Sequence, residues 1–267
     1  MAVDIFFVKR IPFLIGVLIP LGMILCEYLR DRTAAVIGAA LDKFQKKAKQ
    51  QGFDIRAVHS DEEGAIAKLE PELPFVLEKA GPGQHVQVVE RAIRTVKERV
   101  RCHDNSLPFV MNRLLLICCT LFCCSRLNLQ PRSNCIDLVS PMEQYTGRKL
   151  DYKLDFRVEF GEYCQATVTN TDNTMRSRTE GCIAVLPRGN LRGSVGMIQL
   201  KNNQIVTRDQ FVVLPMPDVL VQHVTYMAEK EGFTRGGFDI EVSGERETST
   251  TTQQRTTMMP IDRPVSS

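Results

Sequence analysis

Residues 83–101, GQHVQVVERAIRTVKERVR, constrain the fold more than any other segment, because they carry two stripes of side chains with helical spacing. The first stripe is apolar and consists of Val89, Ile93, Val96 and Val100. The second is charged, lies about a quarter turn away and consists of Glu90, Arg94, Lys97 and Arg101. The pattern predicts a helix with its apolar stripe buried against a sheet and its charged stripe at the rim. A solvated amphipathic helix with i,i+4 charge pairs is the simpler interpretation of this segment taken alone.

Segments typical of strands and of helices alternate through the first half of the chain. Strands are predicted at residues 3–9, at 53–61 and, as one or two buried strands, within 11–28. Helices are predicted at 32–52, 83–102 and 106–128, with a short helix and a loop over 63–80. This order predicts an α/β fold in which helices pack on a sheet.

The uncharged segment 11–26, IPFLIGVLIPLGMILC, allows a second interpretation. It resembles a signal sequence or membrane anchor, since a lysine and an arginine precede it. It is short for a span of about twenty residues, however, and Pro12 and Pro20 interrupt it. We therefore expect a buried strand pair and no membrane partner.

Nine cysteines in 267 residues do not form the pattern of a disulfide framework. Four of them, in LLLICCTLFCC, are Cys118, Cys119, Cys123 and Cys124. Their apolar flanks predict buried, reduced thiols, and no CxxC spacing supports a zinc site. The apolar content of 43% is that of a globular protein, and the net charge of +3 excludes no class of partner.

The character of the sequence changes after residue 128. A loop-rich linker is expected over 129–153, followed by short strand-like runs and turns that predict a small β-rich module over 154–216. A helix and linker are expected over 217–241. The polar, low-complexity tail 242–267 is expected to be disordered.

Three carboxylates are placed by these predictions where they can meet. Asp4 lies on the first strand, Asp61 at the end of the strand 53–61, and Glu90 at the head of the amphipathic helix. Convergent carboxylates suit two Mg²⁺ ions, which assist in-line phosphoryl transfer. The cations Arg94, Lys97 and Arg101 would then hold DNA phosphates beside the metal. Three surface acids with no common role are the alternative.

Several segments resemble the integrases of retroelements, in particular those of the copia type. VVERAIRTVKERVR is similar to the segment after their third acid, and VHSDEEGAI to the strand end that carries their second. DIFFVKRIPFLIGVLIPLG resembles their opening strand pair, and SPMEQYTGRKLDYKLDFRVEFGEYC a segment that follows the catalytic core. The resemblance covers about residues 3–215.

The resemblance implies an RNase H-like core of three layers with a mixed sheet in residues 1–128, within a fragment of a Pol polyprotein. The activity implied is joining of element ends to target DNA, with Mg²⁺ or Mn²⁺ held by Asp4, Asp61 and Glu90. Lys97 matches a basic residue that contacts the DNA end. A homo-oligomer and a nuclear location are implied by the same resemblance.

The chain also departs from the family's pattern. Glu62 and Glu63 follow Asp61 where the family usually has Asn-Gly, and His85-Val86 stands in place of another Asn-Gly. The 28 residues between Asp61 and Glu90 are fewer than usual. An inactive relic that only binds nucleic acid is therefore the alternative function. His59 and His85, near the acids, are expected to pack or to contact DNA.

Overall fold

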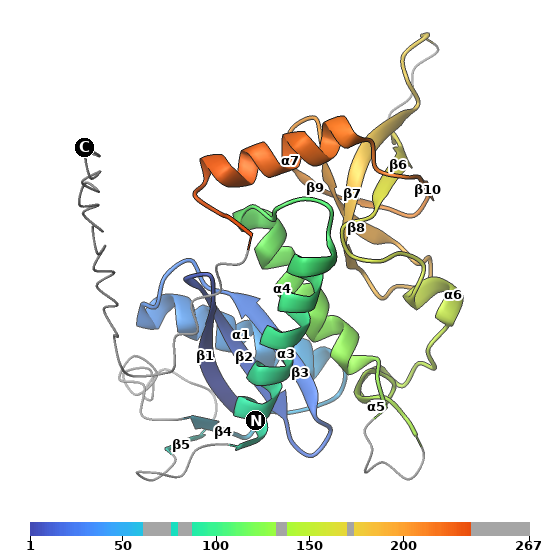
Figure 1. Cartoon of the computed structure of the whole chain (residues 1–267). Helices are drawn as coiled ribbons and strands as arrows, with labels where there is room; N and C mark the ends of the chain where they lie inside the picture. The colour runs from blue at the N-terminus through green and yellow to red at the C-terminus, as the bar shows by residue number, and fades with distance from the viewer. Residues whose placement is uncertain (61–75, 80–86, 132–137, 170–173, 236–267) are drawn as a thin grey trace, which may run out of the picture.

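Five strands form the first sheet of the computed structural model, which describes residues 1–60, 76–79, 87–131, 138–169 and 174–235. They are β1 (Ala2–Val8), β2 (Ile11–Leu18), β3 (Met23–Tyr28), β4 (Ala57–Ser60) and β5 (Val76–Lys79). Their order is β3-β2-β1-β4-β5, with β1 antiparallel to β2 and parallel to β4 (Figure 1). The fold is mixed α/β, and this strand order fits the expected RNase H-like core.

The uncharged segment 11–26 forms β2 and the first part of β3, which confirms the predicted strand pair. All eight residues of β2 are buried, because both faces of the sheet are covered by helices. The turn between β2 and β3 contains Pro20 and Gly22, and Gly22 has a φ of 70°. Among the residues described, no helix is long and apolar enough to cross a membrane.

Strand β5 corrects the interpretation of residues 63–80 as a helix and a loop. Val76–Lys79 pairs in parallel with Ala57–Ser60, which is itself shorter than the strand predicted at 53–61. Four residues contain too little alternation to predict a strand, and this one depends on its pairing with β4. Residues 61–75 and 80–86 lie outside the part of the chain that the structure describes.

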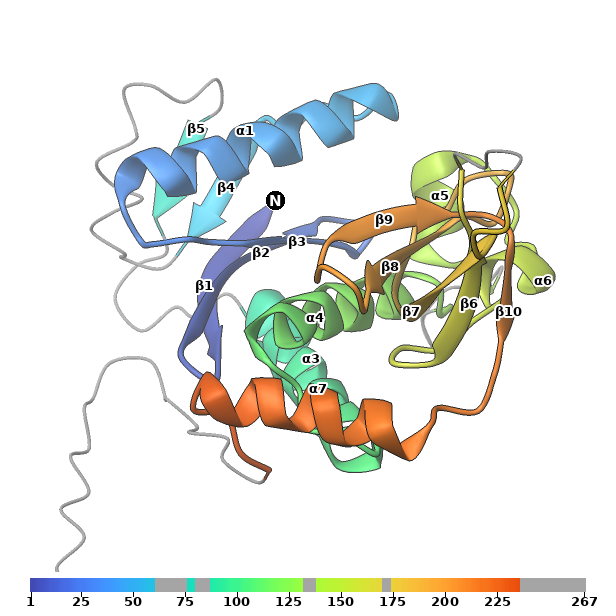
Figure 2. The same cartoon turned by 90° about the horizontal axis from the view of Figure 1, so that it is seen from above.

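Helices cover the two faces of the first sheet and give three layers (Figure 2). Helix α1 (Ala34–Gln50) covers one face, and helices α3 (Gln87–Ser106) and α4 (Arg113–Asn128) cover the other. Side chains alternate along β1, so that Val3 and Ile5 join the core under α1 while Ala2 and Phe6 join the core under α3 and α4. Apolar side chains of α1, among them Ile37, Leu41 and Phe44, are buried there.

Helix α4 begins later than the predicted helix 106–128. The Asn112 side chain caps it by accepting a hydrogen bond from Leu115 N at 2.9 Å. The preceding residues are coil, but Leu107, Phe109 and Met111 are buried among the side chains of the α3–α4 core. The apolar composition of this coil favoured a buried helix, although Pro108 and Asn112 are sequence signals for a helix that starts later.

A second five-stranded sheet follows in the region where a small β-rich module was expected. Its strands are β6 (Tyr163–Thr167), β7 (Thr179–Pro187), β8 (Val195–Gln199), β9 (Ile205–Arg208) and β10 (Phe211–Val213). The order is β10-β6-β7-β8-β9, and all neighbours are antiparallel. Helix α7 (Asp218–Lys230) follows, where a helix was predicted within 217–241. The tail 242–267 lies outside the described residues.

Helix α4 packs against both sheets, contacting β3 of the first and β7 of the second. One hydrophobic core therefore contains Phe13 from the first sheet, Leu116 from α4 and Ile198 from the second sheet. The division into residues 1–128 and 154–216 remains a prediction.

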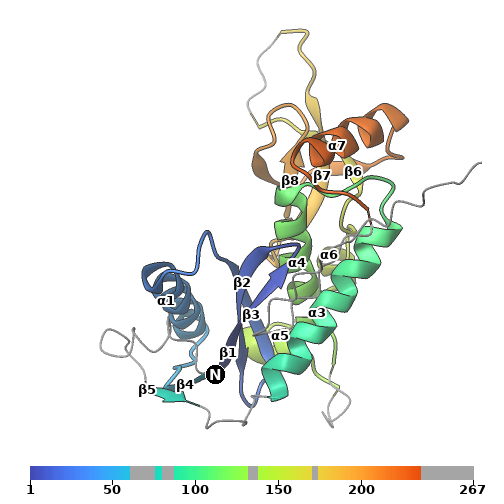
Figure 3. The same ribbon diagram turned by 60° about the vertical axis from the view of Figure 1, so that its left-hand side comes forward.

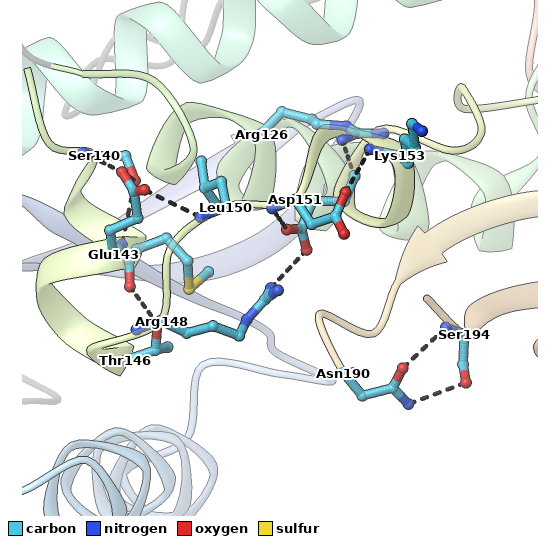
Figure 4. A network of polar contacts seen from close by, with 12 residues as sticks. Arg126, Ser140, Glu143, Thr146, Arg148, Leu150, Asp151, Lys153, Asn190 and Ser194 are labelled. Carbon is cyan, nitrogen blue, oxygen red and sulfur yellow. Dashed lines mark hydrogen bonds and ion pairs between the residues drawn. The ribbon is translucent and has the colours of Figure 1, made fainter. Parts of the chain in front are cut away.

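The linker expected to be loop-rich contains two short helices, α5 (Pro141–Thr146) and α6 (Tyr152–Asp155). Ser140 and Glu143 form a capping box at the start of α5, and Gly147 ends the helix with a φ of 67°. Glu143 also accepts a hydrogen bond from Leu150 N at 3.0 Å, within the polar network of Figure 4. The sequence SPME carries this capping signal, which the prediction of a loop overlooked.

Arg126, in the last turn of α4, fixes this linker to the helix. Its guanidinium donates hydrogen bonds to the carbonyl oxygens of Asp155 at 2.5 Å and Val158 at 2.8 Å. The same group lies 4.8 Å from the ring centroids of both Phe122 and Phe156. Burial lowers the pKa of Arg126 from its usual value, although the negative charges of Glu159 and Asp155 act in the opposite direction. The two rings also favour the cation.

Replacement of Arg126 by methionine is expected to destabilise the protein by about 2 kcal/mol, because two carbonyl groups lose a charged donor. Arg126→Lys should recover less than half of that loss, since an ammonium group cannot bond both carbonyls while stacking between two rings. Urea denaturation measures both values. Arg91→Met, at an exposed position on α3, is the matched control. Equal stability of the parent and the Arg126→Met variant would contradict the role given to Arg126.

Candidate active-site face

Asp4 lies on the central strand of the first sheet, between β2 and β4. It alternates with Val3 and Ile5, and therefore belongs to the face that α3 and α4 cover. The residue is half-buried, and its carboxylate accepts a hydrogen bond from Ile5 N at 2.7 Å. A carboxylate thus lies on an otherwise apolar strand, on the face that α3 and α4 cover.

Strand β4 leads toward the second predicted acid. Ala2 and Val3 of β1 pair with His59 and Ser60, so β4 ends beside the beginning of β1. His59 N donates to the Met1 carbonyl at 2.8 Å, and the His59 side chain is half-buried. Asp61 is the next residue in the sequence and lies outside the described residues, as does His85. The convergence of three carboxylates therefore remains a prediction.

The amphipathic helix is confirmed by α3. Val89, Val96 and Val100 are buried, and Ile93 packs against the same core. Glu90 is exposed and lies in the first turn. The buried stripe faces β1 and β2, so the charged stripe lies at the margin of the helix–sheet contact.

A buried ion pair joins the end of β1 to the last turns of α3. Lys9 Nζ, in the turn after β1, lies 3.3 Å from Asp104 Oδ2 in the last turns of α3. Their side chains are only 6% and 1% exposed. Asp4 precedes Lys9 by about 17 Å along the strand, and Glu90 precedes Asp104 by about 21 Å along the helix. Asp4 and Glu90 thus belong to the same end of the sheet, as Figure 3 shows for the beginnings of β1 and α3.

The predicted cations continue along α3 from Glu90. Arg94 is exposed, and Lys97 and Arg101 are half-buried. They follow Glu90 by about 6, 10 and 16 Å along the helix axis. The arrangement forms a row of positive charge that leads away from the end where Asp4 and Glu90 lie.

The chemistry of the predicted donors suits a hard divalent cation, because carboxylate oxygens are the ligands that Mg²⁺ prefers. Asp4 is positioned for this role, since one backbone N–H orients its half-buried carboxylate. Within the described ranges, no three His, Cys, Asp or Glu side chains form a group that could hold a metal ion. The predicted group includes Asp61, which those ranges omit.

Asp104 is a positioning residue that the prediction overlooked. It continues the apolar stripe, four residues after Val100, and it is buried. An acid at a buried helical position requires a cation to reach it. The helical spacing of Asp104 therefore predicts a buried acid that needs a cationic partner. The sequence alone does not identify Lys9 as that partner.

The four paired cysteines are buried free thiols, as predicted. Cys119 and Cys123 occupy successive turns of α4, and the Cys119 thiol donates a hydrogen bond to the Cys123 sulfur. This bond, aided by His103, lowers the pKa of Cys123 to about 6, although burial alone would raise it. Burial and the donated bond raise the pKa of Cys119 well above its usual value. The pair therefore shares one proton at neutral pH.

Titration should reveal one thiolate with a midpoint near pH 6 in the folded protein, present above that pH and protonated below it. The ultraviolet absorbance of the thiolate measures it without requiring access to the 1%-exposed Cys123. Cys123→Ser should abolish the transition. Cys102→Ser removes an exposed thiol of α3 and should leave it unchanged. A Cys123→Ser protein that keeps the midpoint near 6 would show that another group titrates there.

No protein-family model and no curated protein matches the chain. Among solved structures, the chain is similar to the catalytic core domain of BIV integrase, with 18% identity and a TM-score of 0.42. The similarity covers 55% of this chain and 92% of that one. A likeness at this level adds nothing to the strand order and pairing, which define the fold by themselves.

Proposed function

We propose that the chain is the integrase domain of a copia-type retrotransposon, part of a Pol polyprotein, and that it joins element DNA to target DNA. One observation carries the proposal. The order β3-β2-β1-β4-β5 places Asp4 on the strand beside β4, and α3 brings Glu90 to the same end of the sheet. The sequence motifs around Glu90 and in 140–164, which resemble that family, support the same proposal.

In the proposed mechanism Asp4, Asp61 and Glu90 would hold Mg²⁺ or Mn²⁺. Such ions supply activation of an attacking hydroxyl and stabilisation of a leaving oxygen. Arg94, Lys97 and Arg101 bind phosphates along α3 and orient the DNA toward the carboxylates. Because the cations are fixed on one helix, they fix the direction of the DNA backbone. A nuclear location and a homo-oligomer belong to the same proposal.

The second candidate is a relic that binds nucleic acid without chemistry. The specific observation in its favour is the pair Glu62 and Glu63, which adds negative charge directly after Asp61. The two candidates share the cationic row of α3 and differ only in catalysis.

The deciding experiment is strand transfer by the purified protein. A labelled duplex with a free 3′ hydroxyl is incubated with Mn²⁺, and joined product is resolved by electrophoresis. Product that disappears with a chelator supports the integrase. Salt-sensitive DNA binding without product, with either Mg²⁺ or Mn²⁺, assigns the relic.

A further inference from the structure

A stack of flat groups runs from the interior to the surface beside α6. The ring of Phe122 lies 4.8 Å from the Arg126 guanidinium carbon, and the ring of Phe156 lies 4.8 Å from the same carbon. Phe156 stacks in turn on Tyr152, with ring centroids 5.5 Å apart and an angle of 21° between the planes. The order of the stack is therefore Phe122, Arg126, Phe156 and Tyr152.

The outer end of this stack is open to solvent. Exposure rises from 4% at Phe122 to 41% at Phe156 and 75% at Tyr152. An aromatic ring that is stacked on one side and mostly exposed presents its other face to solvent. Another flat, π-bearing group can extend the stack there with little loss of conformational freedom.

The backbone beneath the stack is already ordered. Asp151 caps α6 by accepting a hydrogen bond from Lys153 N at 2.9 Å. Asp155 accepts hydrogen bonds from Asp151 N at 2.9 Å and from Arg148 Nη2 at 2.7 Å (Figure 4). These bonds order the backbone that carries Tyr152 and Phe156 before any ligand arrives.

Exposed cations lie near Tyr152 in the sequence. Lys149 and Lys153 lie three residues before and one residue after Tyr152, and both are exposed. Gly193, in the β7–β8 turn, packs against Leu154 of α6, and the exposed Arg192 is its neighbour in the chain. The long side chains of Lys149 and Lys153 belong to the same short segment as Tyr152, and their length allows them to approach a ligand stacked on its ring.

We propose that Tyr152 stacks on an unpaired base of single-stranded nucleic acid, while Lys149 and Lys153 contact the adjoining phosphates. Unpaired bases offer a free π-face beside a regular row of negative charges, whereas bases in a duplex already stack on one another. The inference goes beyond the proposed strand transfer, because this site contains none of the three carboxylates and requires no metal. A proline-rich peptide, which also docks on aromatic rings, lacks the phosphates that the lysines would meet.

Fluorescence anisotropy with a short labelled thymidine oligonucleotide, in low salt with a chelator, tests the proposal. Tyr152→Ala should weaken binding by about tenfold, and Tyr152→Phe should bind as the parent does. Tyr226→Ala, which removes another exposed tyrosine on α7, is the matched control and should bind normally. Replacing Lys149 and Lys153 by glutamine should weaken the salt dependence of binding. The negative slope of log affinity against log salt concentration should become shallower by about 0.7 for each lysine removed.

A second measurement reports stacking directly. The chain contains no tryptophan, so Tyr152→Trp creates the single one. The oligonucleotide should quench its emission, and an abasic strand of equal length should not.

The proposal would be overturned by parental affinity in Tyr152→Ala, by equal binding of the abasic strand, or by stronger quenching by a proline-rich peptide. Absence of oligonucleotide binding at low salt would overturn it as well. Tyr152 is exposed, so unchanged melting temperatures verify that the variants are folded. The chelator keeps the result independent of strand transfer, whose failure leaves this site untouched.

Discussion

Replacing Glu90 by glutamine is expected to reduce strand transfer by about a thousandfold or more, which is several kcal/mol of transition-state stabilisation. Glutamine has the size of glutamate but lacks its charge, and a neutral amide is a poor ligand for a hard cation. Glu90 is exposed in the first turn of α3, so the substitution should leave the fold and the melting temperature unchanged. Product formation in the presence of Mn²⁺ is the measurement.

The controls for this prediction come from the same face. Glu98→Gln removes an exposed acid two turns further along α3 and should retain full activity. Asp4→Asn should lose activity to the same extent as Glu90→Gln, and both proteins should still bind DNA. An active parent whose Glu90→Gln variant retains full activity would remove Glu90 from the site, even if strand transfer itself is real.

Replacing Asp104 by asparagine should lower the free energy of unfolding by about 3 kcal/mol. The Lys9 ammonium, only 6% exposed, would lose the carboxylate that compensates its charge, although it would keep its hydrogen bond to the Thr234 carbonyl at 3.1 Å. Thermal and urea denaturation measure the loss. Strand transfer should fall as well, because this ion pair positions α3, and with it Glu90, along β1.

Two companion variants test the cause of that loss. Asp42→Asn breaks the exposed i,i+4 pair of Asp42 with Lys46, whose atoms lie 2.6 Å apart, and should cost less than about 0.5 kcal/mol. Lys9→Met combined with Asp104→Leu should restore most of the stability, since an apolar pair needs no compensating charge. A loss equal to that of Asp42→Asn would show that Lys9 and Asp104 are not coupled in the folded protein.

The sequence predicted those parts of the fold whose side chains repeat with a long, regular period. The apolar stripe of α3 is of this kind. The strand pair β2–β3 was predicted from a different signal, the uncharged run 11–26, which ends one residue before Glu27 of β3. The turn between β1 and β2 gives neither signal, because Lys9 and Arg10 adopt left-handed φ values of 44° and 65° that usually call for Gly or Asn. The ion pair of Lys9 with the distant Asp104 is consistent with a tertiary contact overriding that local preference.

The candidate site was predictable in the same partial way. Alternation along β1 and the helical phase of α3 are sufficient to assign Asp4 and Glu90 to one region. These two patterns do not predict how far each side chain extends. They also do not predict the course of residues 61–75, on which the position of Asp61 depends. For Asp104, the helical spacing was sufficient to predict a buried position. Its partner Lys9 could not be predicted, because it lies 95 residues away in the sequence.

The core shared by the two sheets also affects how the protein is made. The exposed apolar face of α4, with its thiols, is completed only when Ile198 and Val224 join Leu116. A ribosome adding about 5–20 residues per second needs roughly 5–20 s to proceed from α4 to α7. During that interval the nascent chain displays an unfinished apolar helix. We expect the chain to depend on chaperones while it is being synthesised, even though its finished form buries that surface.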